Sequence, residues 1–289
     1  MGTRAFEIEG EWLRGNIHTH TTNSDGELSP RETAKFYAER GYDFIALTDH
    51  WKATRPPLLS PLTVITGVEV DFRTGPGTHT HLVLLGVGDP PFDRHASPAE
   101  AIEFAKAQGG LTILAHPYWS GLELGDFFHL EGLDGIEIFN YSCLLGVGRG
   151  ESTVHWDGLI ERGRLVWGFA CDDSHFHYPD ACGGWVWVKA QGRKPGDIIQ
   201  AMREGLFYSS SGPRIEDFRV EGRRVYVRCS PAVMVKFVCQ RERGFVAFDP
   251  EGRASIREAE VELRGARYVR VEVVDERGRK AWTNPVLLV

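Results

Sequence analysis

The chain has 289 residues, of which 42% are hydrophobic and 25% are charged, a composition typical of a globular protein. This length allows one large core, or one large core together with a small second domain. The formal net charge of -7 excludes a broad electrostatic attraction to duplex nucleic acid, although a local basic pocket for one phosphate remains compatible with it.

The five cysteines are irregularly spaced and include no CxxC pair. This usage predicts reduced thiols and a cytoplasmic location. Cys171 precedes an aspartate by two residues, so it is either a soft metal ligand or a small buried side chain. The segment before Trp12 lacks the apolar core of a signal peptide, and no apolar run reaches the roughly 18 residues of a membrane span. We therefore expect no association with a membrane.

Strand-like and helix-like segments alternate from Trp12 to about Pro213, which is typical of α/β proteins. Strands are expected at residues 16–20, 44–48, 64–68, 82–87, 111–114, 135–139, 165–170, 184–189 and 206–209. Helices are expected at residues 30–40, 97–108, 153–162 and 195–204. Two of these helices begin with a serine, a proline and a glutamate in the pattern of an N-terminal cap, at Ser29 and Ser97. About seven βα units favour a closed, distorted (β/α)7 barrel over an open sheet.

The pattern changes after Gly212-Pro213. Short segments that alternate apolar and charged residues follow, separated by turn dipeptides such as Glu221-Gly222. Strands are expected at residues 215–220, 224–229, 233–239, 245–248, 259–263, 268–274 and 286–289. These features predict a barrel domain at residues 1–213 and a small antiparallel β-sandwich at residues 214–289. The sequence leaves open whether this β-sandwich binds a partner, covers the site as a lid or forms a homo-oligomer.

Nine residues of the types that bind divalent metals follow apolar, strand-like stretches in the first 175 positions. They are His18, His20, Asp25, His50, Glu69, His81, His116, Asp173 and His175. A barrel whose strands all end in imidazoles or carboxylates has the donors for a metal site at its mouth. Any one of these histidines alone is more often a surface or hydrogen-bonded residue. Their joint occurrence favours a metal site.

The spacing of these residues explains how they would converge. In an HxH pair on one strand, as at His18 and His20, both imidazoles point to the same face because side chains alternate with period two. Asp173 and His175 repeat this spacing. Glu69 is a lone carboxylate among histidines and therefore a natural bridge between two ions. Two or three bridged ions would lower the pKa of a shared water and neutralise charge on the substrate, so no side-chain nucleophile is needed.

The segments Gly15–Gly26 and Ile45–His50 resemble the PHP (polymerase and histidinol phosphatase) superfamily, and the tail from Tyr268 to Pro285 resembles its carbaryl-hydrolase-like branch. The resemblance implies a distorted (β/α)7 barrel, two or three divalent ions (manganese, zinc or iron) and, most commonly, phosphoester hydrolysis. It also implies three ion sites: His18, His20, Glu69 and Asp173; Glu69, His81 and His116; and Asp25, His50 and His175. Many relatives have histidine in place of Asp25, so the third site is expected to be harder in character or only partly filled.

Several assignments stay open. His79 and His81 both suit the ligand position, and the spacing to Leu84-Leu85-Gly86 favours His81. Asp49 is expected to support loop geometry, and Asp172 either supports the ligands or is solvated. We expect catalytic roles for Glu69, His81, Asp173 and His175. We expect substrate-binding roles for Tyr118, Trp119, Asn140, His177 and Arg214.

Three functions are compatible with these residues. The leading hypothesis is a metal-dependent phosphoesterase that acts on a small phosphorylated molecule or nucleotide by attack of a metal-bound hydroxide at a di- or trinuclear site. The alternative is a carboxylester, amide or carbamate hydrolase, and a non-catalytic metal-binding scaffold is the third. A phosphatase should direct two or more Arg or Lys side chains at the metals, whereas a carboxylester site should have an apolar pocket.

Overall fold

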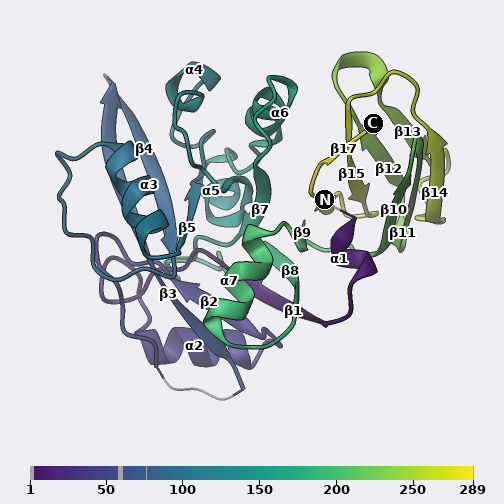
Figure 1. Cartoon of the computed structure of the whole chain (residues 1–289). Coiled ribbons are helices and arrows are strands. Elements are labelled where there is room, and N and C mark those ends of the chain that lie inside the picture. Colours follow the sequence, from purple (N-terminus) through teal and green to yellow (C-terminus); the bar gives the residue numbers. More distant parts are fainter. Residues whose placement is uncertain (1–2, 58–60, 76, 289) are drawn as a thin grey trace.

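A mixed α/β fold with one long sheet forms most of the molecule (Figure 1). The computed structural model describes residues 3–57, 61–75 and 77–288. The strands of this sheet are, in spatial order, β13 (Phe245–Phe248), β12 (Met234–Val238), β15 (Tyr268–Val274), β16 (Lys280–Thr283), β9 (Phe207–Ser210), β8 (Trp185–Ala190), β1 (Glu11–Asn16), β2 (Phe44–Leu47), β3 (Thr63–Gly75), β4 (Thr78–Leu85), β5 (Leu111–Leu114), β6 (Gly135–Asn140) and β7 (Trp167–Cys171), with β17 (Val286–Leu287) pairing to β15.

Two parallel blocks of this sheet position the candidate ligands. β1, β2 and β3 are parallel to one another, and so are β5, β6 and β7. The antiparallel strand β4 joins the blocks by pairing with β3 on one side and β5 on the other. A parallel bridge between Thr19 and Ser174 connects the segments that follow β1 and β7. The chain segments after these parallel strands therefore meet at one edge.

Some expected strand boundaries were wrong. β1 ends at Asn16, so His18 and His20 lie beyond the strand and not on it. β3 and β4 form a long hairpin, which places Glu69 in the middle of β3 and His81 inside β4. These two ligands therefore do not follow strand ends, because their strands continue as an antiparallel ladder beyond the edge where the neighbouring parallel strands stop.

The helices connect the strands and cover the sheet (Figure 1). They are α1 (Arg4–Glu7), α2 (Pro30–Ala38), α3 (Pro98–Ala107), α4 (Leu124–Phe127), α5 (Tyr141–Val147), α6 (Thr153–Glu161) and α7 (Pro195–Arg203). The predicted caps of α2 and α3 are confirmed, since Ser29 and Ser97 each form a reciprocal capping box with a glutamate. The helices α1, α4 and α5 were not predicted. Among the described residues, no helix combines the length and apolar character that a bilayer crossing requires.

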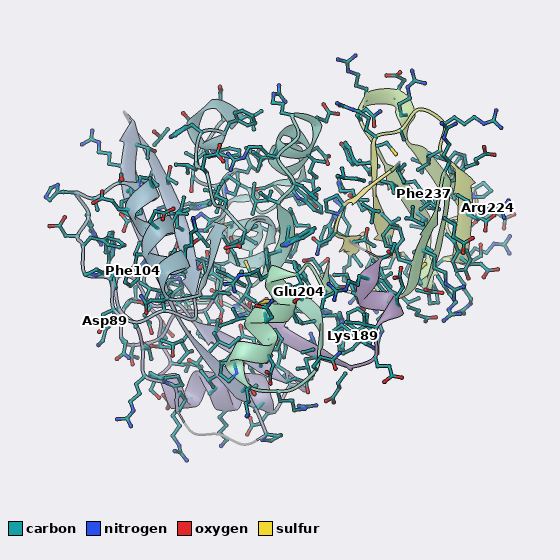
Figure 2. All side chains as sticks on the ribbon, in the orientation of Figure 1. Asp89, Phe104, Lys189, Glu204, Arg224 and Phe237 are labelled. Atoms are coloured by element: carbon teal, nitrogen blue, oxygen red, sulfur yellow. The ribbon has the colours of Figure 1, made fainter. Side chains whose placement is uncertain are left out.

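The C-terminal strands form two antiparallel layers. β10 (Ile215–Glu221), β11 (Arg224–Ala232) and β14 (Ile256–Glu262) make a separate three-stranded sheet. Apolar side chains of this sheet and of β12 and β15 contribute to one buried cluster. Phe237 of β12 belongs to this cluster, whereas the exposed Arg224 lies at the outer edge of the molecule in Figure 2. The alternation of apolar and charged residues on β10, β11 and β14 therefore reflects one face on a core and one in solvent. On β15, by contrast, both faces are buried, including those of the charged residues.

The main sheet continues across the expected domain boundary at residue 213. β16, which was not predicted, pairs with β9, so backbone hydrogen bonds run directly from the N-terminal part to the C-terminal part. The buried guanidinium of Arg270 on β15 adds a bidentate ion pair to Asp157 of α6, at 2.7 and 2.8 Å. Such fork-shaped pairs fix orientation as well as distance, so the C-terminal strands are held firmly against α6.

Candidate metal centre

Three overlapping groups of imidazoles and carboxylates meet at the edge described above. Within each group, every member offers a nitrogen or oxygen atom within 4.8 Å of the others. The groups are His18, His20, Glu69 and Asp173; Glu69, His81 and His116; and His20, Asp25, His50 and His175. The structure therefore brings all nine predicted ligands together, although they are spread over residues 18–175 of the chain.

The first group is fully buried. The Nε2 atoms of His18 and His20 each lie 3.1 Å from Oε2 of Glu69. The same two nitrogens lie 3.1 and 3.2 Å from Oδ1 of Asp173. Two imidazole nitrogens and two carboxylate oxygens thus point at one another across a small space.

The second group uses the other oxygen of the same glutamate. Oε1 of Glu69 lies 2.9 Å from Nδ1 of His81 and 3.1 Å from Nε2 of His116. His79, the alternative to His81, is half-exposed and lies two residues nearer the hairpin turn, 3.9 Å from Asp71. Because Glu69 turns one oxygen toward each group, its carboxylate has the arrangement of a bridging ligand.

The third group lies nearer to solvent. Oδ2 of Asp25 lies 3.5 Å from Nε2 of both His50 and His175, and the Asp25 side chain is 52% exposed. The ring of His20 stacks on that of His175 with centroids 4.2 Å apart, which places the third group directly against the first.

Strained backbone accompanies these ligands. His116 and Asp173 have φ values of 26° and 57°, and Trp51, directly after His50, has a φ of 56°. A residue with a side chain adopts such conformations at a cost of about 1–3 kcal/mol, and these conformations concentrate at functional sites where surrounding structure enforces them. The surrounding structure therefore holds these backbone positions against their local preference.

The residues present fit a divalent metal centre. Oδ1 of Asp173 and Nδ1 of His50 are buried, and among the described residues neither makes a hydrogen bond of suitable geometry, although the His18 and His20 nitrogens lie close to the former. An unpaired buried carboxylate oxygen is costly unless a cation compensates it. Imidazole and carboxylate donors in this mixture suit zinc, manganese or iron.

Glu137, which sequence reasoning missed, supports the centre from behind. Its Oε1 accepts a hydrogen bond from Nδ1 of His18 at 2.6 Å, and its Oε2 accepts from the backbone N–H of His116 and from Asn140 at 2.9 Å each. This partner fixes the His18 tautomer so that Nε2 faces the other ligands. A glutamate inside the wholly buried strand β6 was the available signal.

We expect Glu137→Gln to weaken zinc or manganese affinity by about 10- to 100-fold while the protein stays folded, because His18 loses the acceptor that orients it. Competition with a chromophoric chelator measures the affinity, and circular dichroism checks the fold. The matched control is Glu103→Gln, at an exposed position on α3. Equal affinity for both variants would contradict the supporting role.

The pKa values of the facing imidazoles predict that metal binding depends on pH. Burial alone lowers the pKa of His20, but Asp173 and Glu69 more than offset it and raise the pKa to about 9. The pKa values of His18, His81 and His175 are raised in the same way by neighbouring carboxylates, again against burial.

A divalent ion binds only the neutral imidazole, so binding must release the protons that the metal-free protein carries below these pKa values. We therefore expect affinity to increase as the pH rises toward about 9, by about tenfold per pH unit for each proton released. Titration calorimetry in buffers of different ionisation enthalpy counts these protons. Affinity that falls over this range would contradict the prediction.

Two aspartates beside the ligands hold the surrounding loops. Asp49 accepts hydrogen bonds from Thr21, Ser24 and Thr54, and so shapes the turn that carries Asp25. Asp172 is fully buried, so it is not the solvated carboxylate that the sequence also allowed, and it accepts hydrogen bonds from the backbone N–H groups of residues 182–184. Cys171 is buried behind His18 beside Glu137, and burial raises the pKa of its thiol, which disfavours the thiolate that binds metals. All five cysteines are free thiols.

A cavity of about 390 Å³ opens onto the three groups. Of the predicted substrate-binding residues, Trp119 and His177 line it. Tyr118 is partly exposed and lies beside His155, with ring centroids 6.3 Å apart. Asn140 is buried, caps α5 and donates a 3.1 Å hydrogen bond to Asp173. The guanidinium of Arg214 lies 4.7 Å from the ring of Trp187, so the structure places it at the junction with the C-terminal strands and not among the lining residues.

The cavity lining contains further residues that sequence reasoning did not select. Ser142, Cys143, Gly146 and Val147 come from α5, and Tyr178 comes from the loop after His175. Because α5 was not predicted, these positions had no assigned place at the site.

No protein-family model matches the chain. The uncharacterized protein MJ1587 of Methanocaldococcus jannaschii is 31% identical over 164 residues, which cover 51% of this chain and 86% of the relative. A stretch of 43 residues is 44% identical to the DNA polymerase/3'-5' exonuclease PolX of Bacillus subtilis, but it covers only 15% of this chain and 8% of that protein.

A crystal structure has the same fold. It is that of a two-domain protein from Bacteroides vulgatus described as containing a predicted PHP-like metal-dependent phosphoesterase, and the two chains superpose with a TM-score of 0.55 at 15% identity, covering 96% of each. At this identity the likeness concerns the fold alone. The identity and coverage of the archaeal relative show that the chain belongs to the family of MJ1587. The superposition shows that it has the fold of this PHP-like protein.

Proposed function

We propose that the protein is a metal-dependent phosphoesterase that hydrolyses a small phosphorylated molecule or a nucleotide. The observation that carries this proposal is the carboxylate of Glu69, which turns one oxygen to His18 and His20 and the other to His81 and His116. Adjacent donor groups joined by one carboxylate are the arrangement that two-metal phosphoester hydrolysis requires.

The donor groups, Glu137 and His177 have different roles in this proposal. The three donor groups would hold two or three divalent ions, which when bound lower the pKa of water and neutralise charge on the phosphoryl oxygens. Glu137 keeps the proton on Nδ1 of His18, so that Nε2 stays free to bind. His177 lines the cavity with its Nδ1 3.1 Å from Glu27, and it would pass a proton to the departing oxygen.

The alternative, a carboxylester, amide or carbamate hydrolase, is favoured by one observation. The cavity wall carries Trp119, Val147 and Tyr178, and no Lys or Arg stands among the described residues that line it. The resemblance of the C-terminal tail to the carbaryl-hydrolase-like branch supports the same reading. Both alternatives use the same donor groups and differ in the electrophile.

We further propose that residues 1–213 form the distorted (β/α)7 barrel of the PHP superfamily and that residues 214–289 form a β-sandwich domain. The convergence of the segments after β1 and β7 supports the barrel, and the apolar cluster of the two C-terminal layers supports the sandwich. Tyr208 of β9 also belongs to that cluster, and the main sheet continues across residue 213.

The test is a side-by-side assay of metal-reconstituted protein with p-nitrophenyl phosphate, bis-p-nitrophenyl phosphate and p-nitrophenyl or naphthyl carboxylic esters and carbamates. Hydrolysis of a phosphoester, lost on chelation and regained with zinc or manganese, is the expected result. Hydrolysis of the carboxylic or carbamic substrates alone would contradict the phosphoesterase proposal and support the alternative hydrolase. No turnover by protein that contains metal would support a scaffold role.

A further inference from the structure

The cavity above the donor groups has a floor and a wall of different chemistry. The floor consists of imidazoles and of the carboxylates of Asp25, Glu69 and Asp173. The wall consists of Trp119, of Gly146 and Val147 on α5, and of Tyr178. We infer that the substrate joins its scissile ester to an uncharged, flat group that rests on this wall, and that it carries no second anionic group. This inference rests on the proposed phosphoesterase function.

Trp119 is the central element of the wall. Its indole meets the rings of His116 and His81 nearly at right angles, with centroids 5.0 and 5.9 Å away. The side chain nevertheless remains 44% exposed, so part of its surface is open to a ligand. A flat substituent next to the scissile bond can therefore cover this indole without displacing any residue of the donor groups.

The opposite side of the wall is held in place by hydrogen bonds. Asn140 caps α5 through the N–H of Cys143 and also donates to Asp173, which ties the helix to the floor. The Tyr178 and Ser142 hydroxyls lie 2.7 Å apart, so the tyrosine is fixed against the same helix. Gly146 leaves room for this contact, since a Cβ there would lie 3.2 Å from the Tyr178 hydroxyl. Trp119 and α5 thus line one cavity, here called the slot, whose α5 side is held in place by these contacts.

The slot offers no charged partner to a second anion. The three carboxylates that line the cavity belong to the donor groups and would be compensated by bound ions, and the exposed Glu27 lies 3.1 Å from His177. An anionic group held against Trp119 and Val147 would lose its hydration without gaining a cationic partner among the described lining residues, and such burial is strongly unfavourable. The same contact lowers the free energy of binding of an uncharged aromatic or apolar substituent.

The experiment compares three phosphonates that share one head group and whose P–C bond is not hydrolysed. Methylphosphonate, phenylphosphonate and 4-carboxyphenylphosphonate are titrated calorimetrically into manganese-reconstituted protein. We expect phenylphosphonate to bind about tenfold more tightly than methylphosphonate, a typical effect of one aromatic stacking contact. We expect the added carboxylate to remove this advantage.

Variants locate the effect. Trp119→Ala should abolish the advantage of phenylphosphonate over methylphosphonate, and Trp119→Phe should retain most of it because it keeps an aromatic ring. The matched control is Phe248→Ala, which removes a 64% exposed aromatic ring on β13. The affinity for methylphosphonate and the manganese content report whether the floor is intact in each variant.

The possible failures are distinguishable. Tighter binding of 4-carboxyphenylphosphonate, or equal binding of phenylphosphonate and methylphosphonate by an active phosphoesterase, would overturn the inference and leave the proposed function standing. If no phosphonate binds and no phosphoester is hydrolysed by protein of full manganese content, the proposed function fails and the inference fails with it.

Discussion

Glu69→Gln is expected to lower turnover by about a thousandfold, which corresponds to about 4 kcal/mol of lost transition-state stabilisation. Both oxygens of Glu69 are engaged: Oε2 faces His18 and His20, and Oε1 faces His81 and His116. Glutamine keeps the size of the side chain but replaces one oxygen with an N–H donor and removes the negative charge. One donor group therefore loses its shared ligand, and both lose the charge that compensates a divalent ion.

Elemental analysis of reconstituted protein should show lower metal content for Glu69→Gln, and steady-state kinetics should show the lost turnover. Circular dichroism should stay unchanged, because the ladder of β3 with β4 is formed by backbone groups. Glu216→Gln, at an exposed position on β10, is the control. Wild-type metal content and turnover in Glu69→Gln would remove the bridging role.

Asp172→Asn is expected to lower the free energy of unfolding by about 3–4 kcal/mol, because buried donors would lose a charged acceptor. The carboxylate accepts hydrogen bonds of 2.8 Å from the N–H groups of Cys182, Gly183 and Gly184 and from the hydroxyl of Tyr37. An asparagine amide offers only one oxygen and turns its N–H2 group toward other donors.

Urea denaturation of the metal-free protein measures this loss without the contribution of bound ions. Asp249→Asn is the matched control, since this aspartate also accepts several backbone hydrogen bonds, but in an exposed turn. We expect a smaller loss there because water can replace the lost acceptor. Similar losses in both variants would show that burial of the Asp172 network contributes little.

Local patterns in the sequence were sufficient for the elements whose stabilising contacts lie within a few residues. The boxes at Ser29 and Ser97 depend on groups three residues apart, and the helices begin where expected. Strand ends at β1, β3 and β4 were misplaced, because their lengths depend on neighbours in the sheet rather than on their own residues. The hairpin of β3 and β4 is the clearest case, since its antiparallel pairing extends well past the parallel edge.

The substrate-binding residues were harder to foresee than the ligands. Arg214 was selected because a guanidinium can bind an anion, but in the structure it lies against Trp187. The side chains of α5 at the cavity were not selected, because a seven-residue helix that is capped by Asn140 leaves no periodic signal. Which side chains face a cavity depends on how loops from several strands fold over one another.

By itself, the sequence determined the chemistry available to this protein: nine imidazoles and carboxylates in spacings that suit divalent metals, placed mainly after apolar strands. Only the tertiary structure decided how these donors are grouped, because grouping depends on contacts between distant residues. Glu137 and His18, which are 119 positions apart, meet through a 2.6 Å hydrogen bond. Glu69 becomes a shared ligand because packing of β3 between β2 and β4 directs its two oxygens to separate neighbours.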